Sequence, residues 1–184
     1  MEAFFVSTGV VALAEIGDKT QLLALLLAAR FRAPWPTVAG ILVATLLNHA
    51  LASAVGSWLM TIIGPDAMRW ILGISFIAMA AWTLIPDSAP DESRGPPRYG
   101  VFLTTLIAFF LVEMGDKTQI ATVALAAQFH SITLVVLGTS VGMLLANAPV
   151  VFAGEALMRR VPLEAVRIVA ALSFLALGVY ALVS

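Results

Sequence analysis

Residues 15–21 are Glu-Ile-Gly-Asp-Lys-Thr-Gln, and residues 113–119 are Glu-Met-Gly-Asp-Lys-Thr-Gln. Each copy lies inside a long apolar stretch that otherwise carries almost no charge. An ionisable side chain at membrane depth costs about 2.5–3.5 kcal/mol on insertion scales, so such a residue marks a functional site by default. Two copies at matching places predict that two halves of one protein bring matching charged groups together.

The composition is that of a membrane protein. The 184 residues are 61% hydrophobic and 11% charged, whereas a soluble domain has about 25% charged residues. The chain has no cysteine, which excludes disulfides and thiolate metal sites. Its net charge of −1 argues against a nucleic-acid partner. The N-terminus begins with Glu2 rather than a basic segment, so a cleaved signal peptide is not expected.

Six apolar segments are long enough to cross a bilayer as helices, which takes about 20 residues each. The predicted spans are residues 3–29, 34–63, 68–85, 99–127, 132–157 and 165–184. Residues 87–98 are rich in proline and charge and predict a linker. The spans lack the period-two alternation of membrane strands. The predicted fold is therefore an all-α integral membrane protein with six transmembrane helices.

The two halves of the chain are a repeat. Residues 1–86 align with residues 99–184 without a gap, and identical residues recur along the whole length. We therefore expect a first three-helix repeat at 1–86, a linker at 87–98 and a second repeat at 99–184. Because three is an odd number of spans, the second repeat must be inverted relative to the first. Inverted repeats with a site near the bilayer midplane are typical of secondary transporters.

Arginine placement predicts the orientation. With an external N-terminus, the loops after the first, third and fifth spans face the cytoplasm, and the opposite side keeps only Arg69. The cytoplasmic set is Arg30, Arg32, Arg94, Arg98, Arg159, Arg160 and Arg167. Positive residues collect on the cytoplasmic side of membranes, so both termini should be external and the linker cytoplasmic.

Within a continuous helix, residues three and four apart share a face. The charged groups predicted to share such faces, three from each motif copy, are Glu15, Asp18, Lys19, Glu113, Asp116 and Lys117. Gly17 and Gly115 remove a side chain beside these faces and are expected to let another helix approach closely. Inversion of the repeats would bring the two faces together at similar depth.

The predicted site has four carboxylates, Glu15, Asp18, Glu113 and Asp116, as candidate metal ligands. The supporting or possible ligands are Lys19, Thr20, Gln21, Lys117, Thr118 and Gln119. Four carboxylates and two ammonium groups give a net charge of about −2, which suits a divalent cation. All-oxygen ligands favour Ca²⁺, Mn²⁺ or Mg²⁺ over Zn²⁺ or Cu²⁺.

The same carboxylates can exchange protons, and competition between protons and metal for one site is the minimum needed for antiport. The two lysines either hold the acids in place when the metal is absent or act as permanent internal counter-ions. Asn48, His49 and Asn147, in the middle of the second and fifth spans, are weak candidates for the pathway, and interhelical hydrogen bonding is an equal explanation.

The doubled Glu-x-Gly-Asp-Lys-Thr motif in two three-helix repeats resembles the Gdt-one-type family (uncharacterised protein family sixteen) of manganese/calcium transporters in the calcium/cation antiporter grouping. The resemblance covers essentially the whole chain. It implies export of Mn²⁺, with Ca²⁺ as the alternative, from the cytoplasm in exchange for protons, with the motif acids as the cation site. The short chain without a targeting extension favours a bacterial inner (plasma) membrane.

Other function classes stay open at this stage. The motifs could be buried salt bridges that only lock helices together. An enzyme is not expected, because there is no cysteine nucleophile and no histidine-rich cluster. A passive cation channel would be impeded by fixed lysines beside the acids, and export of another small substrate such as an amino acid is the nearest rival. No resident cofactor is expected, because the metal is a transiently bound cargo. The expected partners are the metal ion, protons and the lipid bilayer, and a homodimer is an open option.

Overall fold

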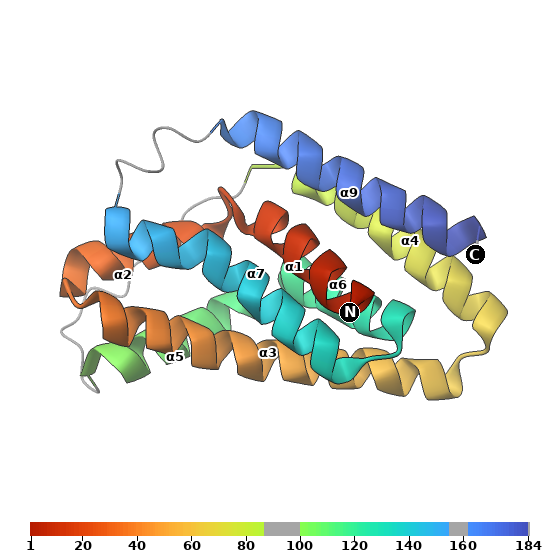
Figure 1. The fold of residues 1–184 in the computed structure, drawn as a ribbon, viewed down its shortest axis with the longest axis horizontal. Coiled ribbons are helices and arrows are strands. Elements are labelled where there is room, and N and C mark those ends of the chain that lie inside the picture. The colour runs from red at the N-terminus through yellow and green to blue at the C-terminus, as the bar shows by residue number, and fades with distance from the viewer. Residues whose placement is uncertain (87–99, 155–161, 184) are drawn as a thin grey trace.

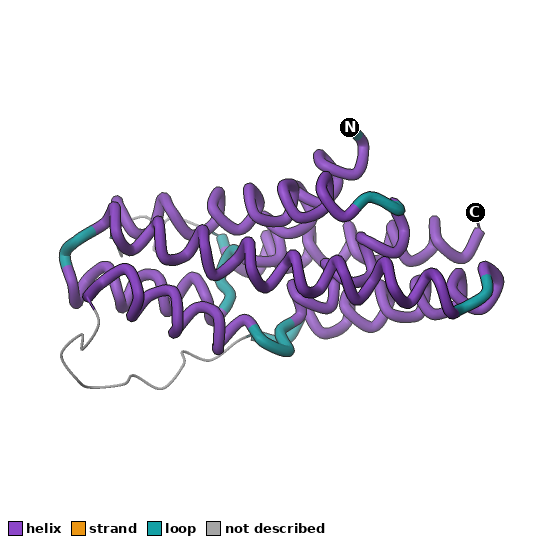
Figure 2. The backbone as a smooth tube through the Cα atoms, turned by 90° about the horizontal axis from the view of Figure 1, so that it is seen from below, coloured by secondary structure: helices purple, strands orange, loops and turns teal. Residues whose placement is uncertain are grey.

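The computed structural model describes residues 1–86, 100–154 and 162–183, and these residues form helices without any strand among them (Figure 1). The helices are α1 (Glu2–Glu15), α2 (Lys19–Phe31), α3 (Pro34–Ile62), α4 (Pro65–Thr83), α5 (Gly100–Glu113), α6 (Lys117–Phe129), α7 (Ile132–Ala153) and α9 (Leu163–Val183). Most of them run along the long axis of the molecule (Figure 2). The all-α prediction is confirmed for the described residues.

Each of the first and fourth predicted spans is divided into two helices. The prediction of a single helix for each of these two spans was therefore wrong. The span predicted at 3–29 is divided into α1 and α2, and the span predicted at 99–127 is divided into α5 and α6. Both breaks lie within the repeated motif. The cause is local, because a glycine in each copy takes a positive φ that a right-handed helix cannot contain.

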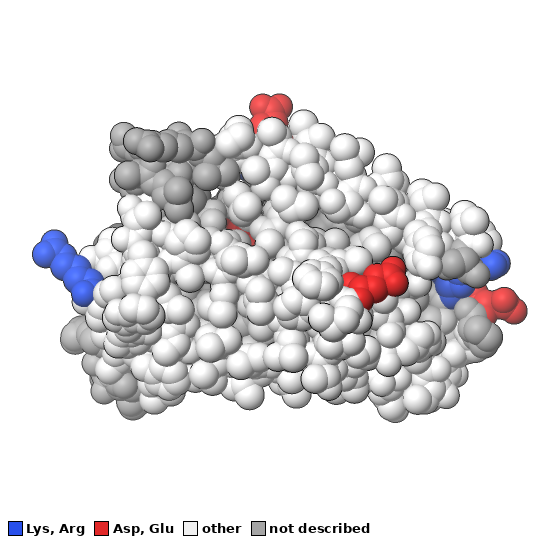
Figure 3. Space-filling model, in the orientation of Figure 1, with Lys and Arg blue, Asp and Glu red and all other residues white. Residues whose placement is uncertain are grey.

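Three helices, α3, α7 and α9, are long and apolar enough to cross a membrane by themselves. The helices α3 and α4 agree closely with the second and third predicted spans. The linker predicted at 87–98 and the end of the span predicted at 132–157 lie outside the described residues. The face in Figure 3 carries few charged side chains. Long apolar helices with a mostly uncharged surface fit a protein surrounded by lipid.

Corresponding helices of the two halves pack on each other in matching ways. Helix α1 packs on α7, and its counterpart α5 packs on α3. The matched glycines Gly40 and Gly138 permit these close approaches. A Cβ atom on Gly40 would lie 2.8 Å from the Phe102 carbonyl oxygen, and one on Gly138 would lie 2.5 Å from the Phe4 carbonyl oxygen. At this matched pair, equivalent residues therefore make equivalent contacts in the two halves.

Helices α4 and α9 lie side by side along one edge of the bundle (Figure 1). The rings of Phe76 and Phe174 stack between them with centroids 6.5 Å apart, and both residues are fully buried. These two phenylalanines occupy matching positions in the repeat. Helices α4 and α9 thus form one side of the molecule. The charged residues lie among α3, α7 and the two broken helices.

Candidate functional site

Each repeated motif is a helix end followed at once by a helix start. Helix α1 ends at Glu15, Asp18 is the N-cap of α2, and the Asp18 side chain accepts a hydrogen bond from the Thr20 backbone N–H at 3.4 Å. In the second copy Asp116 caps α6 and accepts from the Lys117 backbone N–H at 2.8 Å. An aspartate at the N-cap satisfies a backbone donor that the helix leaves unpaired. The acids of each motif are thus presented by two helix ends, not by one helical face.

The two motif glycines shape the break in the helix, and they differ in how closely another helix approaches them. Gly17 has φ +82° and Gly115 has φ +78°, values that favour glycine. A Cβ atom on Gly115 would meet nothing within 4 Å, and one on Gly17 would meet only the side chain of Leu163. The prediction of a close helix approach is therefore wrong for Gly115, whereas Leu163 of α9 does approach Gly17, 3.0 Å from where a Cβ atom would lie.

The two glutamines support the same breaks. Gln21 accepts a hydrogen bond from the Gly17 N–H at 2.8 Å, and Gln119 accepts from the Gly115 N–H at 2.7 Å. The Gln21 amide also donates to the carbonyl oxygen of Ala146 in α7 at 2.8 Å. An aspartate at the N-cap with a glutamine three residues later resembles a capping box. In this structure the glutamine oxygens are engaged by the backbone and do not face the acids as ligands.

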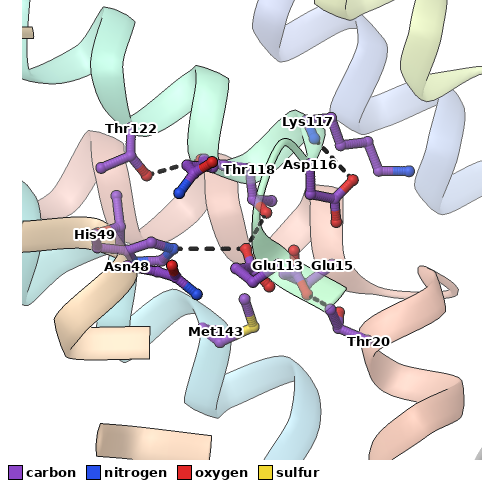
Figure 4. A network of polar contacts seen from close by, with 12 residues as sticks. Glu15, Thr20, Asn48, His49, Glu113, Asp116, Lys117, Thr118, Thr122 and Met143 are labelled. Carbon is purple, nitrogen blue, oxygen red and sulfur yellow. Dashed lines mark hydrogen bonds and ion pairs between the residues drawn. The ribbon is translucent and has the colours of Figure 1, made fainter. Parts of the chain in front are cut away.

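Three carboxylates from the two motifs meet in the interior. Glu15, Glu113 and Asp116 each offer an oxygen, and these atoms lie within 4.8 Å of one another. All three residues are at most 1% exposed. Figure 4 shows Glu15 and Glu113 directed toward each other from different helices. We call these three residues the acidic trio.

Some carboxylate oxygens of the trio accept no hydrogen bond from the described residues. Each glutamate accepts one hydroxyl hydrogen bond inside its own motif, Glu15 from Thr20 and Glu113 from Thr118, the latter at 2.5 Å. The second oxygens of the glutamates and Oδ2 of Asp116 are buried with no hydrogen-bond donor among the described residues. Buried acceptors are normally satisfied. A divalent cation bound by carboxylate oxygens would be a suitable partner for such acceptors.

The lysines connect the two motifs. The Lys19 ammonium lies 3.2 Å from Asp116 Oδ1, and the Lys117 ammonium forms an ion pair with Asp18. The lysine of each copy therefore pairs with the aspartate of the other. Asp18, the fourth predicted ligand, is buried, pairs with Lys117 and shares the Thr20 hydroxyl with Glu15. The Lys19 side chain is 27% exposed and that of Lys117 is 4% exposed, so the two halves differ in access to solvent or lipid.

The weak pathway candidates on α3 and α7 have different surroundings. The His49 Nε2 atom lies 3.7 Å from Glu113 Oε1 (Figure 4). The Asn48 amide donates to the Phe110 carbonyl oxygen at 3.1 Å, which is the interhelical bond allowed by the sequence. The Asn147 amide donates within its own helix, to the carbonyl oxygen and the sulfur of Met143. Among these three residues, a polar atom within 4 Å of a trio carboxylate is found only for His49.

Sequence reasoning missed two features of the site. The first is the new helix that starts within each motif. The sequence could have predicted it, because Asp-Lys-Thr-Gln after a glycine is a typical helix N-terminal pattern. The buried Met143, which lies close to the trio in Figure 4, had no comparable signal in an apolar segment. Its counterpart in the repeat is Thr45, so only a position-by-position comparison of the halves marks it as different.

The apolar helices and the buried, duplicated acidic centre define a class, namely α-helical membrane proteins with a charged interior site. The sequence pattern described as the divalent cation/proton antiporter GDT1 matches residues 3–91 and 101–184. The chain therefore belongs to the GDT1 family of divalent cation/proton antiporters, and the family resemblance deduced from the motifs is confirmed.

Relatives in several organisms agree with this membership. The chain is 49% identical over 176 residues to a Vibrio cholerae protein named "Putative manganese exporter", a match that covers 95% of this chain and 88% of that protein. It is 27% identical over 206 residues to GDT1-like protein 3 of Arabidopsis thaliana, covering 97% of this chain and 69% of that protein. A GDT1-like protein of Synechocystis sp. is 28% identical over 146 residues, which cover 69% of this chain and 71% of the relative. No solved structure matches the chain.

Proposed function

We propose that this GDT1-family chain is a secondary active transporter that exports Mn²⁺ from the cytoplasm in exchange for protons, with Ca²⁺ as the alternative cargo. The observation that carries the proposal is the acidic trio. Two motifs far apart in sequence supply Glu15, Glu113 and Asp116, whose oxygens lie within 4.8 Å of one another in the buried interior. The 49% identity to a protein named a manganese exporter supports Mn²⁺ as the cargo.

Hard oxygen ligands match this cargo. Ca²⁺ binds six to eight oxygens at about 2.3–2.6 Å, and Mn²⁺ also suits carboxylate and water ligands. The trio offers one unsatisfied oxygen from each residue, so water or further protein oxygens would complete the shell. The ion is a substrate that passes through, and no resident cofactor or catalytic residue is part of the proposal.

Asp18 is proposed to join the cation site during the transport cycle. In this structure its carboxylate pairs with Lys117, as Asp116 pairs with Lys19. The two lysines then act as internal counter-ions that compensate the acids when no metal is bound. Removing an ion from buried carboxylates would otherwise leave like charges crowded in a low dielectric. Protons arriving at the same carboxylates would serve this purpose too, which couples proton entry to metal release.

The proposed architecture is two inverted repeats, residues 1–86 and 99–184, each with three spans of which the first is broken. Broken helices that meet near the midplane at the repeat interface are how many secondary transporters build a substrate site. The matching packing of α1 on α7 and α5 on α3 supports this arrangement. We place the chain in the inner membrane of a bacterium with both termini external.

The direct test is transport by the full chain in proteoliposomes, with Mn²⁺, Ca²⁺ and Mg²⁺ compared with and without a pH gradient. Antiport predicts that a gradient acidic on the trans side drives Mn²⁺ movement and that Mn²⁺ movement carries protons the other way. The membrane potential is clamped with an ionophore. Cation flux without proton movement would contradict proton exchange and favour a channel. Flux of an amino acid without flux of any metal would contradict the cargo.

A further inference from the structure

His49 is a buried histidine that lies beside the acidic trio and outside both repeated motifs. It lies in the middle of α3, is fully buried, and places Nε2 3.7 Å from Glu113 Oε1 (Figure 4). Neither ring nitrogen has a hydrogen-bond partner among the described residues. A distance of 3.7 Å is too long for a hydrogen bond. A buried polar group without a partner costs about 1–3 kcal/mol, so this position calls for a partner that the described part of the chain does not supply.

The spacing suits two ligands of one ion. Metal–nitrogen and metal–oxygen bonds in proteins are about 2.0–2.6 Å long, so two ligand atoms on the same ion can stand 3.7 Å apart. Glu113 is already a member of the trio, and its Oε2 atom has no hydrogen-bond donor among the described residues. An ion held by Glu113 on its α3 side is therefore within reach of the imidazole.

We infer that His49 donates an imidazole nitrogen to the transported cation at Glu113 and thereby makes the site favour Mn²⁺ over Ca²⁺ and Mg²⁺. This inference rests on the proposed function and adds a selectivity determinant to it. Ca²⁺ takes oxygen ligands almost exclusively, and Mg²⁺ keeps several waters beside carboxylates. Mn²⁺ is a transition-metal ion that accepts nitrogen as well as oxygen. Carboxylates alone would serve all three ions, so the imidazole nitrogen is the ligand that distinguishes Mn²⁺ from the other two.

The repeat shows that helix packing does not demand a histidine here. The matching residue in the second half is Asn147, and its amide donates to the Met143 carbonyl oxygen at 3.0 Å and sulfur at 2.9 Å. The asparagine thus satisfies its amide protons within α7, whereas the histidine leaves both nitrogens unpaired. The two halves are alike in their acids, but the buried polar residues of α3 are not all repeated in α7, and His49 is the one of them with a polar atom near a trio carboxylate. An asymmetry of this kind is expected from a ligand specific to one side of the site.

The first test is spectroscopic and uses the full-length wild-type protein. Pulsed electron paramagnetic resonance on Mn²⁺-loaded protein, with ¹⁵N-labelled histidine, reports whether a histidine nitrogen is bound to the metal. The chain has only two histidines, so His130→Asn is a matched control. We expect nitrogen coupling in the wild type and in His130→Asn, and its loss in His49→Asn. Mn²⁺ bound without histidine coupling in the wild type would overturn the inference, whatever the variants do.

The second test is competition in proteoliposomes. Changes to groups that bind or support a metal typically alter affinity 10–100-fold. His49→Asn should therefore lower the ratio of Mn²⁺ to Ca²⁺ apparent affinities by about tenfold or more, with Ca²⁺ transport retained. An equal loss for both ions, or an unchanged ratio, would overturn the inference while the proposed function stands. Wild-type protein that neither binds nor transports any divalent cation would instead overturn the proposed function.

Discussion

Replacing Lys117 by methionine should destabilise the protein more than the same change at Lys19. The Lys117 side chain is 4% exposed and its partner Asp18 is fully buried. Removing one partner of a buried ion pair costs about 3–5 kcal/mol, because a buried charge is left without compensation. The Lys19 side chain is 27% exposed. Solvent at the Lys19 end weakens this pair, but its partner Asp116 is buried, so Lys19→Met should cost less than Lys117→Met, about 1–3 kcal/mol.

The assay is reversible unfolding of the purified protein in mixed dodecylmaltoside and sodium dodecyl sulfate micelles, followed by circular dichroism. The double variant Lys117→Met with Asp18→Asn removes both charges and serves as the control. With Asp18→Asn measured as well, the loss in the double variant should fall short of the sum of the two single losses by about 0.5–3 kcal/mol, the range of measured couplings between contacting residues. Equal losses for the two lysine variants, or strict additivity in the double variant, would refute the reasoning.

Three further outcomes are expected. Gly115→Ala should cost about 1–2 kcal/mol of unfolding free energy, since its φ of +78° strains any L residue, whereas Gly9→Ala in the open middle of α1 should cost nothing. Equal effects of the two changes would contradict the account of the helix break. Ser93→Cys should be labelled from the cytoplasm and Ser184→Cys from outside, and labelling of both from one side would end the inverted-repeat proposal. Mn²⁺ affinity should weaken as pH falls, because metal binding to carboxylates displaces protons; a pH-independent affinity by titration calorimetry would contradict competition.

The helices and the two matching halves could largely be predicted from the sequence, because the internal repeat and the long apolar segments leave few other folds. The alignment of 1–86 with 99–184 predicted that the halves share a design, and the matched contacts of Gly40 and Gly138 agree with it. The helix breaks at Gly17 and Gly115 were not predicted, because the apolar residues on both sides of each glycine favour one long helix. The signal was the N-cap aspartate with its glutamine, which predicts a helix start.

The membership of the site was predictable, but its internal pairing was not. A carboxylate inside an apolar span is conspicuous in any sequence. The pairing of Asp18 with the lysine of the other motif depends on how two helix breaks meet in space, which no local pattern determines. The difference between His49 and Asn147 was visible in the alignment, but only the 3.7 Å approach to Glu113 gives that difference a chemical meaning.

The central claim is that the acidic trio binds the transported divalent cation. The most direct measurement is equilibrium binding of Mn²⁺ to the purified, full-length protein and its variants in detergent. Glu15→Gln, Glu113→Gln and Asp116→Asn should each lower Mn²⁺ affinity by about tenfold or more. The exposed acids Glu2 and Glu164, changed to glutamine, should leave it unaltered. Wild-type affinity in any one of the three trio variants would contradict the claim.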